Sequence, residues 1–136
     1  MLEGAEVVVD ASVIVDLVTD SPRAPGIAEM LGHRRLHAPA HVDAEVLSAL
    51  GRLERAGAMT PRAARRALMR ATSTPLDRSP LPELMEGAWR RRKHLRISDA
   101  LYVELADRLG IPFLTSDQRL GRAHPAAVVV AGDPPA

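Results

Sequence analysis

The chain has 136 residues and a mass of 14.7 kDa, a length that fits one compact domain. Its 18 basic and 17 acidic residues nearly cancel, so any binding to nucleic acid or a membrane surface must come from local charge clustering. The absence of cysteine excludes disulfides, zinc–thiolate sites and a cysteine nucleophile. We expect an unprocessed cytoplasmic protein without membrane contact, because no apolar stretch is long enough to span a bilayer and no signal-peptide pattern is present.

The first part of the chain alternates between strand and helix patterns. Residues 7–9 form a continuous β-branched run, which is typical of a strand covered on both faces. Helical spacing begins at Ser12, so the chain passes directly from strand into helix. Ser21 and Pro22 have the pattern of an N-cap and first helical position, which predicts a second helix that ends near Gly32.

The remaining sequence continues this alternation without an internal repeat or a long linker. The expected elements, in chain order, are a strand at 36–39, helices at 42–57 and 60–70, a short strand around 76, helices at 82–94 and 99–109, and strands at 111–115 and 127–130. Ser98 and Gly110 are the expected N-cap and stop of the late helix. The pattern predicts one domain over residues 1–136, an α/β sandwich on a largely parallel sheet, with a frayed tail at 132–136.

Four acids fall at positions that core packing does not explain. Asp10 and Asp117 directly follow predicted strands, and parallel sheets place their sites at the carboxyl ends of strands. Aspartate is also a preferred helix N-cap, so capping explains either residue alone equally well. Glu45 and Asp99 lie on helices among residues that face the core, where a carboxylate is costly unless hydrogen bonds or a cation compensate it.

A bound metal ion accounts for the four acids together. Oxygen donors without a histidine or cysteine pattern favour a hard ion, Mg²⁺ or Mn²⁺, over zinc. Such ions bridge a phosphate, lower the pKa of a bound water and neutralise the leaving oxygen. The predicted chemistry is therefore phosphodiester hydrolysis.

Four segments carry a family resemblance in their order along the chain: VVDASVIVDL, APAHVDAEVLSAL, ISDALYVELA and IPFLTSDQRL. They resemble the PIN-domain ribonucleases, in particular the VapC-type toxins of bacterial toxin–antitoxin pairs, over about residues 6–131. The resemblance implies a PIN-like three-layer α/β/α sandwich with a central, mostly parallel sheet. It also implies a Mg²⁺- or Mn²⁺-dependent endoribonuclease that acts on structured RNA such as tRNA or rRNA, a cognate antitoxin, and commonly a homodimer.

The resemblance also implies roles for individual residues. Asp10 matches the acid at the end of the first strand and Asp99 the acid that opens the late helix, which makes these two the principal metal ligands. Glu45 on the middle helix and Asp117 in the Thr-x-Asp pattern complete the acidic pocket, and Asp117 is a further metal ligand. Ser12 matches the hydroxyl residue of the DxS/T start, with an expected hydrogen bond to the site or to the scissile phosphate.

Other acids are assigned to the surface. Asp16 lies outside the apolar stripe of its helix, which favours a solvated position. Asp43 lies roughly 200° around the helix from Glu45, so at most one of the two faces a shared pocket, and the resemblance favours Glu45. Glu104 and Asp107 are expected on the surface of the late helix, where Glu104 is spaced for an ion pair four residues on.

Basic and aromatic residues leave the mode of RNA binding open. The arginines between residues 62 and 70 and the run 90–93 fit either phosphate contacts or solvated helix faces. Trp89 and Tyr102 occur within apolar helical patterns and are assigned to the core. With three aromatic residues in the chain, base stacking cannot dominate recognition, which would rest on shape, phosphates and arginine.

Two other classes of protein are alternatives to the ribonuclease. A phosphatase of the haloacid-dehalogenase type also begins with a strand that ends in aspartate, but it needs a second acid two residues on, where this chain has Ser12. A non-catalytic α/β binding module, in which the acids are helix caps and surface ion pairs, would bind no Mn²⁺ and cleave no RNA.

Overall fold

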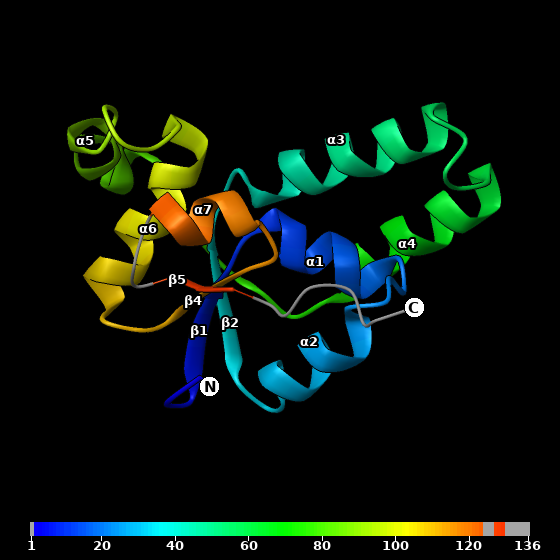
Figure 1. Cartoon of the computed structure of the whole chain (residues 1–136), viewed down its shortest axis with the longest axis horizontal. Coiled ribbons are helices and arrows are strands. Elements are labelled where there is room, and N and C mark those ends of the chain that lie inside the picture. Colours follow the sequence, from blue (N-terminus) through cyan, green and yellow to red (C-terminus); the bar gives the residue numbers. More distant parts are fainter. Residues whose placement is uncertain (1, 124–126, 130–136) are drawn as a thin grey trace.

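Five parallel strands form one sheet in the order β3-β2-β1-β4-β5, with β1 in the centre (Figure 1). The structure, a computed structural model, describes residues 2–123 and 127–129. The strands are β1 (Glu6–Val9), β2 (Arg35–Pro39), β3 (Asp77–Ser79), β4 (Phe113–Thr115) and β5 (Ala127–Val129). The predicted α/β class is confirmed, and every strand pair is parallel.

Helices cover the two faces of the sheet (Figure 1). One group comprises α1 (Ala11–Val18), α2 (Ala24–Leu31), α3 (Val42–Arg55) and α4 (Pro61–Ser73), which pack around α1. On the opposite face lie α5 (Pro82–Arg90) and α6 (Ile97–Leu109), with α6 in contact with β1, β2 and β4. The short helix α7 (Gln118–Ala123) follows β4. The result is the predicted three-layer sandwich.

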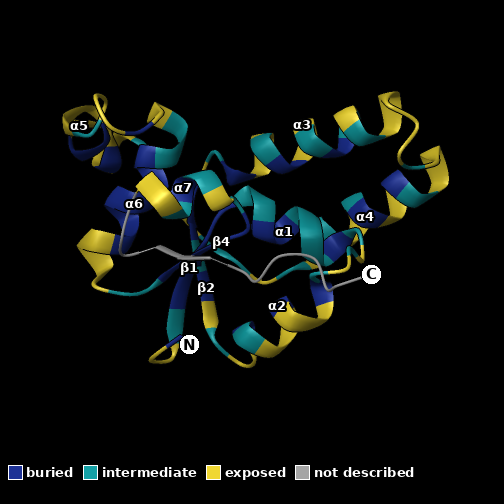
Figure 2. Ribbon diagram, in the orientation of Figure 1, coloured by how far each residue is buried: buried dark blue, intermediate teal, exposed yellow. Residues whose placement is uncertain are grey.

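The core lies where the central strand meets these two helical layers (Figure 2). Val7, Val8 and Val9 are fully buried, as expected for a strand covered on both faces. Helix α6 is buried along most of its length, from Ala100 to Ala106. Its apolar residues therefore surround the helix instead of forming a stripe, and Tyr102 lies in the core as predicted.

Two helix starts differ from the sequence prediction. Helix α6 begins at Ile97 with Arg96 as its N-cap, so Ser98 lies inside the helix and its hydroxyl bonds to Glu45. Helix α2 begins at Ala24, because the Ser21 hydroxyl accepts the Arg23 amide in a preceding turn. Both helices end at the predicted glycines, Gly32 and Gly110, which have positive φ angles.

Two further burial predictions were wrong. Trp89 is 60% exposed, because the buried face of α5 consists of Leu84, Gly87 and Ala88. Glu104 is buried, because Arg91 from the segment after α5 reaches it and pairs with its carboxylate.

Two further predictions concern the C-terminal residues and membrane-spanning helices. The predicted strand end at Val130 and the predicted frayed tail lie outside the described residues. None of the helices described here is long and apolar enough to cross a membrane.

Candidate active site

The carboxyl ends of β1 and β4 meet at a polar cleft of about 460 Å³. The parallel register pairs Val9 with Leu114, which brings Asp10, directly after β1, beside Thr115, the last residue of β4. The walls come from five separate segments of the chain. The lining residues are Asp10, Ala11, Ser12, Val15, Asp16, Arg23, Glu45, Ala49, Arg52, Asp99, Tyr102, Ser116 and Asp117. All five predicted catalytic residues thus line one cleft.

Asp10 lies at the base of this cleft and is 6% exposed. Its Oδ1 accepts hydrogen bonds from the Ser12 hydroxyl at 2.5 Å and the Val13 amide at 3.2 Å. Its Oδ2 accepts the Thr115 hydroxyl at 2.5 Å. Asp10 is also the N-cap of α1, so capping and a place in the site are compatible.

Burial raises the pKa of Asp10 to about 6. The hydrogen bonds from Ser12, Thr115 and Val13 oppose this rise because they stabilise the ionised carboxylate, whereas the nearby charge of Asp99 adds to it. The three hydrogen bonds therefore do not offset the hydration that this carboxylate loses on burial. A cation beside Asp10 and Asp99 would stabilise both in the ionised form.

The Ser12 hydroxyl joins the two strand ends. It donates to Asp10 and accepts the backbone amide of Ser116 at 3.0 Å. The Ser116 hydroxyl is buried and has no hydrogen-bond partner among the described residues. Ser12 thus orients Asp10, while Ser116 offers a free hydroxyl at the edge of the cleft.

Asp99 and Asp117 share a single arginine. The Arg119 Nη2 atom donates to Asp99 Oδ2 and to Asp117 Oδ2, each at 3.0 Å. Asp117 Oδ1 accepts the amides of Arg119 and Leu120, so this acid also caps the first turn of α7. The guanidinium partly neutralises the two carboxylates in this conformation.

Glu45 is held by α6. Its Oε1 accepts the Tyr102 hydroxyl and its Oε2 accepts the Ser98 hydroxyl, both at 2.5 Å. His41 Nε2 lies 3.4 Å from Glu45 Oε1. Burial raises the pKa of Tyr102, as does its bond to Glu45, so the phenol keeps its proton and remains a donor. Asp43 points away from the cleft, as the helical spacing predicted. It pairs with Arg78.

The assignment of Asp16 to a solvated position was wrong. Its side chain is 17% exposed, lines the cleft and lies 3.6 Å from Arg23 Nη1. Asp16 follows Ser12 by four residues, so the two share a face of α1, and that spacing was the available signal. Sequence reasoning also missed Arg119, whose role depends on contacts between β4, α6 and α7.

The oxygen donors of the cleft are of the kind that a hard cation prefers. Every predicted ligand is a carboxylate, and the acid at the base is buried with a raised pKa. Among the residues that the structure describes, no three carboxylate or imidazole groups converge closely enough to enclose an ion. Mg²⁺ does not need such a cage, because it is usually held by one or two carboxylates with water and substrate phosphate completing the shell. The residues present fit an ion of that kind.

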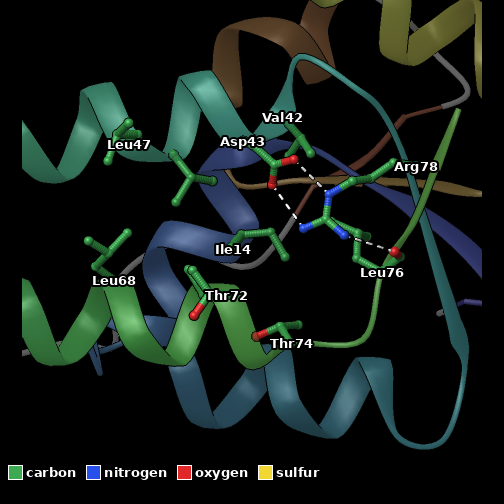
Figure 3. A pocket seen from close by; sticks show the side chains of 11 residues that line it. Ile14, Val42, Asp43, Leu47, Leu68, Thr72, Thr74, Leu76 and Arg78 are labelled. Carbon is green, nitrogen blue, oxygen red and sulfur yellow. Dashed lines mark hydrogen bonds and ion pairs between the residues drawn. The ribbon is translucent and has the colours of Figure 1, made fainter. Parts of the chain in front are cut away.

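A second hollow, of about 360 Å³, lies on the other side of α1 and α3 (Figure 3). It is largely apolar, with Ile14, Val46, Leu47 and Leu68 among its walls. The Asp43–Arg78 ion pair forms its polar edge. It offers a binding surface without a cluster of acids, so we place the chemistry in the polar cleft.

Residues 7–124 match the PIN domain family. The chain belongs to this family. It is 51% identical to Ribonuclease VapC3 of Mycobacterium tuberculosis over 90% of both chains. It is also 32% identical to Ribonuclease VapC12 of the same organism, over 87% of this chain and 92% of the relative. The predicted PIN ribonuclease of the VapC type is confirmed.

Solved structures agree with this membership. PAE2754 from Pyrobaculum aerophilum superposes with a TM-score of 0.68 at 26% identity, covering 93% of this chain and 84% of the other. The sarcin–ricin loop cleaving toxin VapC20 of M. tuberculosis gives a TM-score of 0.63 at 20% identity, over 87% and 95% of the two chains, and supports the fold. The family match and the 51% identical relative favour the ribonuclease over the phosphatase and the non-catalytic module.

Proposed function

We propose that the protein is a toxin endoribonuclease whose catalytic residues are Asp10, Glu45, Asp99 and Asp117, with Ser12 positioning Asp10. One observation carries this proposal: the four acids come from four segments and line one cleft at the carboxyl ends of β1 and β4, in a chain of the PIN family. Parallel α/β sheets bind their ligands at this edge.

The proposed metal ligands are Asp10, Asp99 and Asp117. A Mg²⁺ or Mn²⁺ ion, when bound, lowers the pKa of water and neutralises charge on the phosphate. The buried carboxylate of Asp10 and the neighbouring charge of Asp99 support this assignment. Because Arg119 bridges Asp99 and Asp117, its guanidinium must move or share these acids when the ion binds.

Glu45 has a different role in this proposal. Its carboxylate is held by two hydroxyl donors, Ser98 and Tyr102, while its side chain remains 35% exposed to the cleft. A fixed carboxylate that reaches solvent is suited to orient the attacking water and to accept its proton. Arg52, on the same face of α3 two turns later, also lines the cleft, and we assign it to contact with the phosphate backbone.

Cleavage by the purified protein tests the activity. Protein separated from any antitoxin should cleave RNA in Mg²⁺ or Mn²⁺, and Asp10→Asn and Asp99→Asn should remove this activity. Comparison of the two ions at equal concentration identifies the preferred cofactor. The proposal fails if wild-type protein cleaves no RNA with either ion and if its induction slows growth no more than that of Asp10→Asn.

We propose a structured RNA, such as tRNA or rRNA, as the substrate. Few aromatic side chains are available for base readout, so recognition depends largely on shape and on phosphate contacts. Sequencing of RNA 5′ ends after induction in the Asp10→Asn and wild-type backgrounds identifies the cleaved molecule. Scattered ends in single-stranded mRNA would contradict a structured target.

The VapC relatives imply an antitoxin as partner, and we propose that it docks in the apolar hollow of Figure 3. An apolar helix from the antitoxin would cover Leu47, which is 58% exposed, and pack on Leu68. We further propose a homodimer that works in the cytoplasm, where RNA and antitoxin are made. Sedimentation of the free and antitoxin-bound protein tests the dimer.

A further inference from the structure

Trp89 is an unusual surface residue. It is the single tryptophan of the chain, lies in the last turn of α5 and is 60% exposed. Tryptophan is highly buried on average, because burial removes its large apolar ring from water. Here the contact of α5 with α6 uses Leu84 and Ala88 instead. The exposed ring is therefore not needed to hold α5 in place.

Arg92 holds this ring in a defined arrangement. Its guanidinium carbon lies 4.5 Å from the centre of the Trp89 ring, and its Nη1 donates to the Trp89 carbonyl oxygen at 3.0 Å. The cation and the ring therefore form one preorganised surface, flat and positively charged. Surfaces of this kind bind nucleobases by stacking and phosphates by charge.

The charges around Trp89 divide into two groups. Arg90 pairs with Glu86, and Arg91 pairs with Glu104 and Asp107. Lys93 and Arg96 are exposed, and no carboxylate of the described residues lies within ion-pair distance of either.

The second group gives this surface its charge. Arg92, Lys93 and Arg96 lie along the segment that follows Trp89, and none of these three basic side chains has an acidic partner among the described residues. The run 90–93, which the sequence predicts within a helix that extends to residue 94, instead leaves α5 at Arg90 and continues as turns. Its positive charge therefore gathers beside the aromatic ring.

The chain segment that carries this surface continues into the helix that lines the cleft. Arg96 is the N-cap of α6, Ser98 bonds to Glu45, and Asp99 lines the cleft in the first turn of the same helix. Arg92 and Asp99 are seven positions apart, so their Cα atoms lie within about 25 Å even on a fully extended chain. A single RNA strand that touches both spans only a few nucleotides.

We propose that Trp89, Arg92, Lys93 and Arg96 form a binding site for an unpaired nucleotide of the RNA substrate, beside the cleavage site. The Trp89 ring stacks on the base, and the three basic side chains contact the flanking phosphates. The inference rests on the proposed ribonuclease function and adds to it a subsite for single-stranded RNA. The charge favours RNA over a second copy of the chain, since a two-fold contact through this face would set like charges against one another.

Tryptophan fluorescence tests the site directly, because Trp89 is the only tryptophan. The probe is a short single-stranded oligouridylate, added to the full-length Asp10→Asn protein in EDTA so that no cleavage occurs. We expect the emission of Trp89 to be quenched as RNA binds. Trp89→Ala, followed by anisotropy of a labelled oligouridylate, should raise the Kd about 5- to 150-fold, and Trp89→Phe should restore most of the binding.

Matched variants separate stacking from charge and from folding. Met85→Ala removes another exposed apolar side chain one turn earlier on α5, at 61% exposure, and should leave the Kd unchanged. Lys93→Ala should weaken binding and reduce its dependence on salt. Far-ultraviolet circular dichroism and the Tm of Trp89→Ala should match wild type, because the ring is exposed.

The outcomes also distinguish this inference from the proposed function. RNA-independent blue shift of the emission with rising protein concentration, together with loss of a dimer in Trp89→Ala, would assign this face to a protein interface and overturn the inference. An unchanged Kd in Trp89→Ala would overturn it as well, even if the protein cleaves RNA. Binding through Trp89 without any cleavage by wild-type protein in Mg²⁺ or Mn²⁺ would overturn the ribonuclease and leave an RNA-binding site.

Discussion

Asp10 combines two demands that conflict within a single side chain. As the N-cap of α1 and the acceptor of three hydrogen bonds, it stabilises the junction between strand and helix. Its burial makes the ionised form costly, and the same ionised form is the one that holds a metal. The hydrogen bonds and the proposed metal site therefore both favour the ionised carboxylate, whereas burial favours the protonated one.

This conflict predicts an unusual dependence of stability on pH. The pKa of Asp10 rises from 3.8 to about 6 on folding, so between these values the folded protein binds more protons than the unfolded chain. In EDTA, the contribution of Asp10 to the free energy of unfolding should be full below pH 4 and fall as the pH rises through 6. The loss is about 3 kcal/mol.

Urea unfolding of wild type and Asp10→Asn across this pH range measures the effect. The difference between the two proteins cancels other titrating groups, and wild type should lose stability relative to the variant as the pH rises. Mn²⁺ should reverse the trend above pH 6, because an ion bound to the folded state stabilises the ionised acid. A constant difference between the two proteins would rule out the raised pKa.

In the proposed metal site, Arg119 would compete with the ion for Asp99 and Asp117. Replacing it by alanine removes the guanidinium that bridges these carboxylates, and the two acids then repel each other until a cation binds. Arg119→Ala should therefore bind Mn²⁺ several-fold more tightly than wild type in calorimetric titrations without RNA. Arg122→Ala, an exposed change on the same helix, is the matched control. Weaker binding in Arg119→Ala would show that the arginine helps to shape the metal site.

At the scale of elements, the contact between α5 and α6 is built around a buried acid. Glu104 pairs with Arg91 at 3.2 Å and fits against α5 at Gly87. A methyl group at Gly87 would lie 2.0 Å from the Glu104 carboxyl carbon. The glycine therefore provides the space in which this ion pair is enclosed.

Gly87→Ala should destabilise the protein by about 1–3 kcal/mol, because the carboxylate must move and its pairing with Arg91 is strained. Gly26→Ala is the control, since a methyl group there meets nothing within 4 Å and alanine is the better helix former. Chemical unfolding should give opposite signs for the two variants. Equal stability of Gly87→Ala and wild type would mean that Glu104 adapts without cost.

Patterns local to the sequence predicted most of the elements, including all five strands and the glycine stops of α2 and α6. Errors arose where a tertiary contact decides the outcome. Ser98 has the composition of an N-cap, but its hydroxyl bonds to Glu45 on another helix. Trp89 has the spacing of a core residue, but the place it would take against α6 is filled by smaller side chains.

At the scale of the whole molecule, α1 and α3 separate two surfaces. Ser12 and Glu45 face the polar cleft, whereas Ile14 and Leu47 of the same two helices face the apolar hollow (Figure 3). An antitoxin helix docked in the hollow as proposed would lie directly behind the walls of the cleft. It is placed to extend a following segment over the acids.

Leu47→Glu should separate inhibition from catalysis. A charge at this exposed position of the hollow disfavours an apolar partner but touches none of the acids in the cleft. We expect RNA cleavage at the wild-type rate and loss of protection by the antitoxin, measured in a cleavage assay with both proteins. Glu54→Gln, an exposed change later on α3, is the control. Full protection of Leu47→Glu would exclude the hollow as the docking site.

The five predicted site residues line one cleft because each follows a strand or opens a helix at the same edge of the sheet, a relation that sequence order and parallel pairing reveal. Their partners were not predictable in this way. The contacts of Arg119 and Tyr102 depend on the distance between elements, for which one sequence holds no local signal.

The bond from Thr115 to Asp10 spans 105 positions of the chain. A ribosome adds about 5–20 residues each second, so about 5–20 seconds pass between synthesis of the first acid and synthesis of the hydroxyl that fixes it. During this time the emerging polypeptide has neither Asp117 nor β4, the strand that pairs with the end of β1. In the proposed site the nascent chain therefore lacks these groups during most of its synthesis, and we expect RNA cleavage only once β4 has left the ribosome.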